Sequence, residues 1–306
     1  MKHISRQLPF CAVVFFAFCA VTFAQEKVEI KNVWSEGRYT IRQEIFNSRI
    51  DSIVETRAVV GKTQTRGQFV WQVDAAAPRA DGVQVLTLKA TRVALRYEQD
   101  ALTPYSSDSG DMLNADDYEK NVYEIFQNSP IVVSIKDGAV LKVEGCEEFW
   151  AKVPEPKSER ATLFHTLMKG LATVSGFGEV FTQLDYPLPS GAVAVGDAWE
   201  KTVKIQAGIS DSVLWKCKRE PNAKSGRDEL AALYAEAVLT LPVANSAAKI
   251  TIEAKYNVEQ QIVAEFGAKT AVSVSREVTL GEGDDAETFN IKTISLIRNN
   301  LVVAKR

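Results

Sequence analysis

The chain has 306 residues, of which 46% are hydrophobic, and its 36 Lys and Arg against 39 Asp and Glu give a formal net charge of −3. Basic and acidic residues are interspersed without a basic tract. This argues against nucleic-acid binding, which depends on neutralising phosphates.

The first 24 residues have the order of a cleavable secretory signal peptide. Lys2 and Arg6 precede an uncharged apolar run over 10–20, and Thr22 and Ala24 place small residues at positions −3 and −1 of the cleavage site. The run is shorter than the about 20 residues of a membrane-spanning helix, although an uncleaved anchor is an alternative. We therefore expect an exported mature chain of 282 residues, periplasmic or extracellular, without a transmembrane segment. Its net charge becomes −5, because the leader holds two basic and no acidic residues.

A first group of strands is predicted between residues 39 and 97. Apolar and polar residues alternate over 39–45 and 69–74, with a turn at Asp81-Gly82. The apolar face then changes along 83–97, from Leu86, Leu88 and Ala90 to Val93, Leu95 and Tyr97. A bulge near Thr91-Arg92 would reconcile the two faces. Long bent strands of this kind indicate a curved sheet.

A helical middle follows. Asn114 could cap a helix with Asp116 and Asp117 in its first turn, and an apolar stripe runs from Tyr118 to Phe126. Residues 131–135 and 140–143 flank Asp137-Gly138 and predict a hairpin. Ser158 is predicted to cap a second helix, which the glycines at 176 and 178 would end.

A second group of strands is predicted after the prolines at 187 and 189. The segments 199–205, 213–218, 250–258, 272–280 and 289 onward alternate, with a turn at 281–285. Residues 229–241 are rich in Ala and Leu and favour helix by propensity. Their position between strands favours a strand instead.

The two groups of strands resemble each other. Each opens with a glycine and an aromatic residue (Gly37 and Tyr39; Gly196 and Trp199), and each has a tryptophan on the apolar face of a strand, Trp71 and Trp215. Duplication of a half-barrel and chance similarity between β segments both account for this. The predicted division is a signal peptide at 1–24, an N-terminal β-rich half with the helical segment at 25–178, and a C-terminal β-rich half at 179–306.

The stretch from Pro189 to Glu200, PSGAVAVGDAWE, resembles a signature of a bacterial family of secreted β-rich proteins with a domain of unknown function. Members carry P-x-x-x-V-x-V-G-D-x-W between a helical middle and a second β half, so the resemblance covers nearly all of the mature chain. It implies no activity and no functional residues. The motif itself predicts a structural role: Gly196 allows a turn, Asp197 bonds its own loop, and Trp199 anchors the next strand.

The cysteines and histidines offer little chemistry. Cys11 and Cys19 leave with the leader, so the mature chain keeps Cys146 and Cys217, which could form a disulfide or remain two buried thiols. His165 is the sole histidine of the mature chain and lies off the apolar stripe of its helix, so we expect it to be exposed. No nucleophile elbow is present.

Acidic clusters and tryptophans are the remaining candidates for a binding site. Acidic residues cluster at Asp108, Asp111, Asp116 and Asp117, and again at Glu282, Asp284 and Asp285, without the spacing of a calcium loop. Helix starts and a solvated turn explain both clusters. Several of the five tryptophans lie at alternating strand positions, which favours core packing over a sugar-binding platform.

These observations predict a mostly β α+β fold: two curved antiparallel sheets, which duplicated half-barrels would explain, with two helices from the central segment. No catalytic residue, cofactor or metal site is predicted. The favoured function is a non-enzymatic binding protein for a lipid-like or apolar ligand, by analogy with extracytoplasmic carriers in which a helix crosses a curved sheet. The alternative is a structural or protein-interaction component of the bacterial cell envelope.

Overall fold

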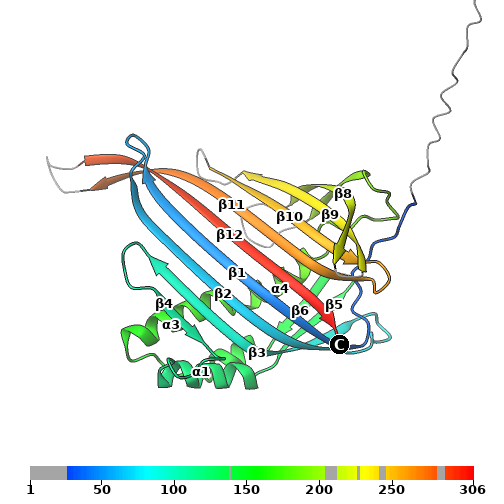
Figure 1. Cartoon of the computed structure of the whole chain (residues 1–306), viewed down its shortest axis with the longest axis horizontal. Coiled ribbons are helices and arrows are strands. Elements are labelled where there is room, and N and C mark those ends of the chain that lie inside the picture. The colour runs from blue at the N-terminus through cyan, green and yellow to red at the C-terminus, as the bar shows by residue number, and fades with distance from the viewer. Residues whose placement is uncertain (1–25, 138, 204–211, 226–227, 241–245, 281–286) are drawn as a thin grey trace, which may run out of the picture.

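The computed structural model describes residues 26–137, 139–203, 212–225, 228–240, 246–280 and 287–306. Within these residues one antiparallel sheet of twelve strands curves around four helices (Figure 1). The strands are β1 (Gly37–Ile53), β2 (Val59–Ala75), β3 (Gln84–Gln99), β4 (Tyr105–Asp108), β5 (Ile131–Lys136), β6 (Ala139–Glu144), β7 (Ala198–Val203), β8 (Val213–Ser225), β9 (Asp228–Thr240), β10 (Ala247–Asn257), β11 (Ile262–Leu280) and β12 (Glu287–Lys305). The helices are α1 (Asp117–Asn128), α2 (Cys146–Trp150), α3 (Glu159–Leu171) and α4 (Val174–Gln183).

The strand order explains how the chain builds one sheet. The strands follow one another as β6-β5-β3-β2-β1-β12-β11-β10-β9-β8-β7, and β4 pairs with β3. The two halves join at the centre, where β1 pairs with β12 from Tyr39↔Lys305 to Ile53↔Ile291. The mostly β fold is confirmed, whereas the two predicted sheets are one, because alternation shows which face a residue takes and not which strands pair.

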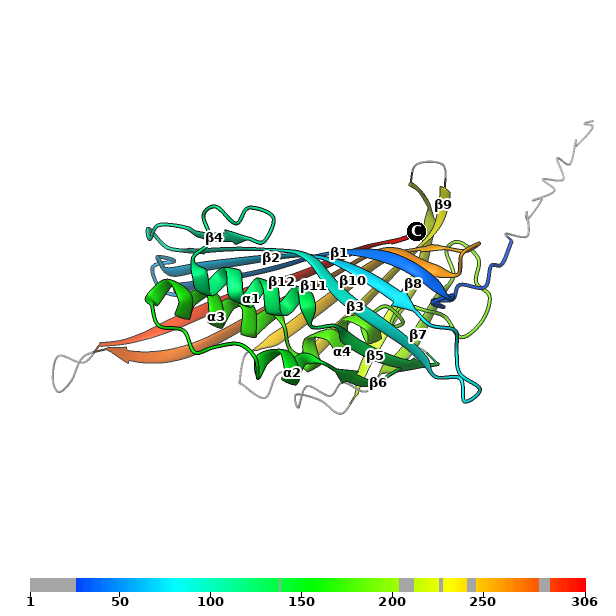
Figure 2. The ribbon, with the colours of Figure 1, turned by 90° about the horizontal axis from the view of Figure 1, so that it is seen from below.

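The segment between β6 and β7 has to cross the molecule, because these strands form opposite edges of the sheet. It carries α2, α3 and α4, and together with α1 these helices lie along one face of the curved sheet (Figure 2). That face is called the inner face below. The helices are therefore a cover over the inner face.

The predicted bulge and the ambiguous strand are both confirmed. Trp71 pairs with Ala90 and Val70 with Arg92, which leaves Thr91 as the extra residue, and its Oγ1 donates to the carbonyl of Val70 at 3.0 Å. Residues 228–240 form β9 rather than a helix. Pairing with β8 and β10 on both sides overrides their helix propensity.

The helices differ from the prediction in number and in their ends. Four are present in the described residues instead of two. Asp116, not Asn114, caps α1, since its carboxylate accepts from the backbone N–H of Glu119 at 2.8 Å. Ser158 caps α3 as predicted, but α3 ends at Leu171, because Thr173 caps a new helix by accepting from the N–H of Gly176.

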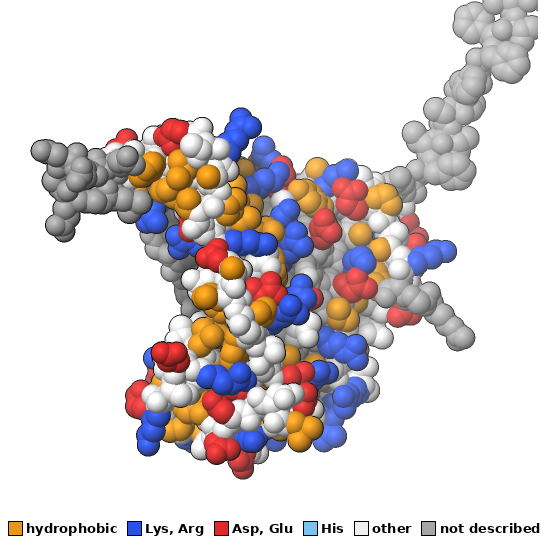
Figure 3. Space-filling view, turned by 60° about the vertical axis from the view of Figure 1, so that its left-hand side comes forward, with side chains coloured by type: hydrophobic (Ala, Val, Ile, Leu, Met, Phe, Trp, Pro, Cys, Tyr) orange, Lys and Arg blue, Asp and Glu red, His pale blue; other side chains and the backbone are white. Residues whose placement is uncertain are grey.

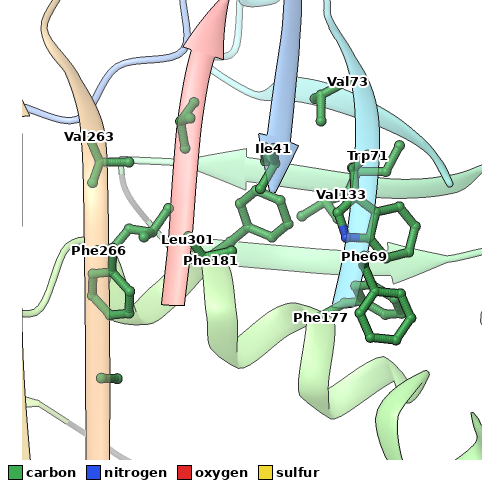
Figure 4. Close-up of a cluster of buried hydrophobic side chains, with 14 of the residues drawn as sticks. Ile41, Phe69, Trp71, Val73, Val133, Phe177, Phe181, Val263, Phe266 and Leu301 are labelled. Atoms are coloured by element: carbon green, nitrogen blue, oxygen red, sulfur yellow. The ribbon is translucent and has the colours of Figure 1, made fainter. Parts of the chain in front are cut away.

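The core lies between the inner face of the sheet and the helices. Phe177 and Phe181 of α4 point toward the sheet, where Phe177 packs edge-on to Trp71 with ring centroids 5.3 Å apart (Figure 4). Phe69 stacks beside Trp71 at 5.6 Å. At Gly67 of β2, an added Cβ would lie 2.8 Å from Cδ1 of Leu171, so the glycine lets the end of α3 reach the sheet.

A buried carboxylate ties α1 to the sheet and to α3. Glu119 has no solvent-exposed side-chain surface. It accepts hydrogen bonds from the hydroxyls of Tyr105 at 2.7 Å and Ser107 at 2.9 Å and from Nη2 of Arg160 at 3.2 Å, and its Oε1 forms an ion pair with Nε of Arg160 at 2.8 Å. Burial, together with the hydrogen bond to this carboxylate, raises the pKa of Tyr105 far above its ordinary value.

Some expectations fall on parts of the chain that are not described. The predicted signal peptide, residues 1–24, lies outside the described residues, as does the acidic turn at 281–285 with Glu282, Asp284 and Asp285. No helix among the described residues has the length and apolar character needed to cross a membrane.

Candidate functional site

The candidate site is a cavity of about 330 Å³ between the inner face of the sheet and the helical cover. The cover contributes the end of α3 and one side of α4, and the sheet contributes β1, β2 and β9–β12. The lining residues are Gln43, Ile45, Phe69, Trp71, Gly170, Leu171, Gly176, Phe177, Val180, Gln183, Leu239, Ile250, Ala268, Thr270, Ile297 and Asn299. None of them carries a charge. The volume lies at the lower end of the range for small-molecule sites, about 300–1,000 Å³.

Small residues create this space. Ala268 on β11 and Gly170 at the end of α3 leave room that larger side chains would fill. The cavity reaches the surface: Ile297 lines it with 41% of its surface exposed, and Gly170 is exposed as well. An apolar molecule could therefore enter without local unfolding.

Two amides and an indole form a polar chain in the cavity wall. Nε1 of Trp71 donates to Oε1 of Gln43 at 3.2 Å, and Nε2 of Gln43 donates to Oδ1 of Asn299 at 3.3 Å. Gln43 and Trp71 are buried, while Asn299 keeps some exposure. These groups place hydrogen-bonding capacity within an otherwise apolar wall.

The surface of the protein also carries apolar groups. β1, β2, β11 and β12 run past the helices as a projecting arm, and hydrophobic side chains gather on this part of the molecule (Figures 1 and 3). The exposed ones at the turn between β1 and β2 include Val54, Val59 and Val60. Single exposed valines are common, whereas these three are grouped at the far end of the β1–β2 hairpin, away from the cavity.

A second polar cluster lies apart from the cavity, under the loop that follows α4. Asp185 accepts from Nδ2 of Asn32 at 3.2 Å, and its backbone carbonyl accepts from Nζ of Lys201 at 2.7 Å. Burial raises the pKa of Asp185 to about 7, although Asn32 and the ammonium of Lys201 oppose the shift. Tyr256 donates to the carbonyl of Leu184 beside it. The thiol of Cys217 borders this cluster, since it interacts electrostatically with both Lys201 and Tyr256.

The motif residues Gly196, Asp197 and Trp199 surround a buried arginine. Gly196 has φ +90°, which favours glycine, and Oδ2 of Asp197 accepts from the N–H of Ala194 at 2.9 Å. Arg219 is 3% exposed and donates from Nη1 to the carbonyl of Val193 at 2.5 Å. Trp199 is half-buried against the core. This geometry is that of a loop that holds β7 onto β8.

The cysteines are two separate buried thiols in the structure, and no disulfide joins them. Cys146 begins α2, and Cys217 lies on the inner face of β8, each 3% exposed. Burial raises the pKa of each thiol to about 11. We expect 5,5′-dithiobis(2-nitrobenzoate) to label two thiols per unfolded mature chain, which lacks Cys11 and Cys19, and to label the folded protein at least about 100-fold more slowly. Failure to find any thiol after unfolding without reductant would instead indicate a disulfide.

The other candidates have ordinary structural partners. His165 is half-buried rather than exposed: Nδ1 lies 2.5 Å from the Tyr118 hydroxyl, and its ring centre is 5.3 Å from that of Trp150. Its position off the stripe faces α1 and α2, which periodicity alone does not reveal. Trp71 and Trp215 are buried in the core, as predicted from alternation, and Trp34, which precedes β1, is buried as well.

The acidic residues between 108 and 117 have separate local roles and do not form one site. Asp108 pairs with Arg92 at 2.6 Å, Asp111 bonds Nδ2 of Asn114, and Asp116 caps α1. In the part of the chain that the structure describes, no group of three or more His, Cys, Asp or Glu residues comes together as metal ligands would.

The sequence reasoning missed the polar residues of the cavity. The alternation over 39–45 puts Gln43 on the same face as Tyr39, Ile41 and Ile45, but no sequence motif marks Asn299 or Thr270 as site residues. Alternation along their strands is the signal that could have placed both on the inner face. The structure puts them there, since Asn299 pairs with Ile45 and Thr270 pairs with Ile250. Their meeting under α4 depends on the β1–β12 pairing.

Comparison with known proteins leaves the family open. No protein-family model and no curated protein matches the chain. Among solved structures, a lipovitellin structure on lipid–protein interactions is 13% identical with a TM-score of 0.46, over 89% of this chain. The chain spans a quarter of the length of that lipovitellin chain. The outer membrane protein OprG from Pseudomonas aeruginosa is 6% identical over 91% of this chain and all of its own, with a TM-score of 0.15. Neither likeness establishes a shared fold.

Proposed function

We propose that this protein is an exported, non-enzymatic carrier that binds an apolar ligand between its curved sheet and helical cover. The observation that carries the proposal is the cavity of about 330 Å³, which is lined without charged groups and open beside Ile297. Apolar walls with a few fixed polar groups are typical of small-molecule sites. Export follows from the leader predicted at residues 1–24.

The surroundings of the cavity support binding rather than catalysis. Its polar groups are amides and a hydroxyl (Gln43, Gln183, Asn299 and Thr270), which neither attack a substrate nor transfer protons near neutral pH. The thiols of Cys146 and Cys217 are buried and have raised pKa values. Burying the apolar surface of a ligand contributes about 25 cal/mol of favourable binding free energy per Å² removed from water.

Binding is tested first with diphenylhexatriene, a rod-shaped hydrocarbon that fluoresces in apolar surroundings. We expect the mature protein to bind it with saturation at one site. Thr270→Phe places a ring in the cavity and should weaken binding at least about 10-fold, which corresponds to about 1.4 kcal/mol. Native mass spectrometry of protein from the exporting host should also show extra mass that organic extraction removes.

The matched control is Lys269→Phe. Lys269 is the neighbouring residue of the same strand, is exposed, and faces away from the cavity. It adds the same ring without filling the site, so binding should be unchanged. A wild-type protein that is isolated bare and does not bind the hydrocarbon would overturn the carrier proposal. That outcome would favour a structural component of the cell envelope.

A further inference from the structure

The hydrogen bonds in the cavity wall have a direction. An indole N–H can only donate, so the atom of Gln43 that faces Nε1 of Trp71 has to be its oxygen. The other end of the Gln43 amide is then its NH₂ group. It donates to Asn299, which therefore presents its own oxygen to Gln43 at 3.3 Å.

This direction leaves the side-chain NH₂ group of Asn299 without a partner in the hydrogen-bonded chain. With Oδ1 engaged by Gln43, the two protons on Nδ2 are directed elsewhere, and no acceptor for Nδ2 is found among the described residues. Asn299 lines the cavity and is half-buried. The chain Trp71–Gln43–Asn299 therefore ends in a donor at the cavity.

The absence of charged residues from the cavity lining disfavours an ionised ligand. None of the sixteen lining residues is Lys, Arg, His, Asp or Glu, so an ionised group on the ligand would lose part of its hydration without gaining a partner of opposite charge. A neutral oxygen acceptor loses less hydration free energy than an ionised group does. Nδ2 of Asn299 can donate the hydrogen bond that water gave to this oxygen.

We infer that the ligand is an uncharged lipid-like molecule with a carbonyl oxygen, such as an acyl ester or amide, and that Nδ2 of Asn299 donates to this oxygen. The inference rests on the carrier proposal and adds the class of ligand. The aliphatic part of the ligand lies against Phe69, Phe177 and Ile250, and the carbonyl lies at β12.

Competition against bound diphenylhexatriene tests the ligand class. Three competitors share one chain length: methyl tetradecanoate, tetradecanoate and tetradecyltrimethylammonium. We expect the neutral ester to displace the hydrocarbon at a concentration at least about 10-fold lower than either ion, the margin of one satisfied hydrogen bond without a buried charge. Equal or better competition by tetradecanoate would overturn the inference and point to a carboxylate ligand.

Two substitutions test the donor. Asn299→Asp at pH 8 keeps the oxygen that accepts from Gln43 and replaces the NH₂ by an acceptor, and Asn299→Leu removes both. Each should weaken the ester about 10-fold while diphenylhexatriene still binds, which also reports that the variant is folded. Unchanged ester affinity in both variants would refute the role of Asn299 and leave the carrier proposal standing. Absence of hydrocarbon binding in the wild type would instead refute the carrier proposal itself.

Discussion

Replacing Glu119 by alanine is expected to destabilise the protein by about 3 kcal/mol or more. The side chain has no exposed surface, accepts hydrogen bonds from Tyr105 at 2.7 Å and Ser107 at 2.9 Å, and forms an ion pair with Arg160 at 2.8 Å. Removing it leaves two buried hydroxyls without their acceptor and deprives the guanidinium of its partner. Because the side chain of Arg160 is 42% exposed, water can solvate the arginine, and the two hydroxyls account for most of the loss.

Urea denaturation of Glu119→Ala measures this loss, with Glu124→Ala as the matched control. Glu124 belongs to the same helix and is exposed, so its replacement should change the free energy of unfolding by less than about 0.5 kcal/mol. Glu119→Gln keeps an acceptor and most of the volume, and should fall between the two. Equal stabilities of the two alanine variants would show that the carboxylate does not hold α1 in place.

Glu119 also illustrates what sequence alone could not show. Val122 and Phe126 belong to the apolar stripe of α1, and no local sequence pattern marks Glu119 for burial. It is buried because β4 brings Tyr105 and Ser107 against α1 and α3 brings Arg160. Those contacts join segments far apart in the chain, which local periodicity does not report.

The difference between local and long-range contacts also explains which parts of the fold the sequence predicts. Most strands, the bulge at Thr91 and the cap at Ser158 depend on neighbouring residues, and the sequence patterns predict them correctly, whereas the short β4 was not predicted. The single sheet depends on the pairing of β1 with β12, whose partners are about 250 residues apart. The cavity depends on that pairing and on how α4 crosses it, so its residues appear only in the structure.

Replacing Asp185 by asparagine is expected to stabilise the protein at alkaline pH and to change how stability varies with pH. The folded pKa is raised to about 7 from an ordinary value of 3.8, mainly by burial. The protonated carboxyl therefore stabilises the folded state fully below about pH 4, and this stabilisation is lost as the pH rises through about 7. Asparagine remains neutral throughout and can still accept from Asn32 at Oδ1.

The difference in the free energy of unfolding between Asp185→Asn and wild type should grow by about 2–3 kcal/mol from pH 5 to pH 8, since each pKa unit corresponds to about 1.4 kcal/mol. Urea denaturation at both pH values measures it. Asp117→Asn is the control, because the Asp117 side chain is fully exposed and its difference from wild type should not grow. The ammonium of Lys201 still donates to the backbone carbonyl of residue 185 in the variant, so that anchor of β7 is preserved. Parallel curves for Asp185→Asn and wild type would mean that the carboxylate is solvated or fully neutralised by Lys201, and that burial does not control its protonation.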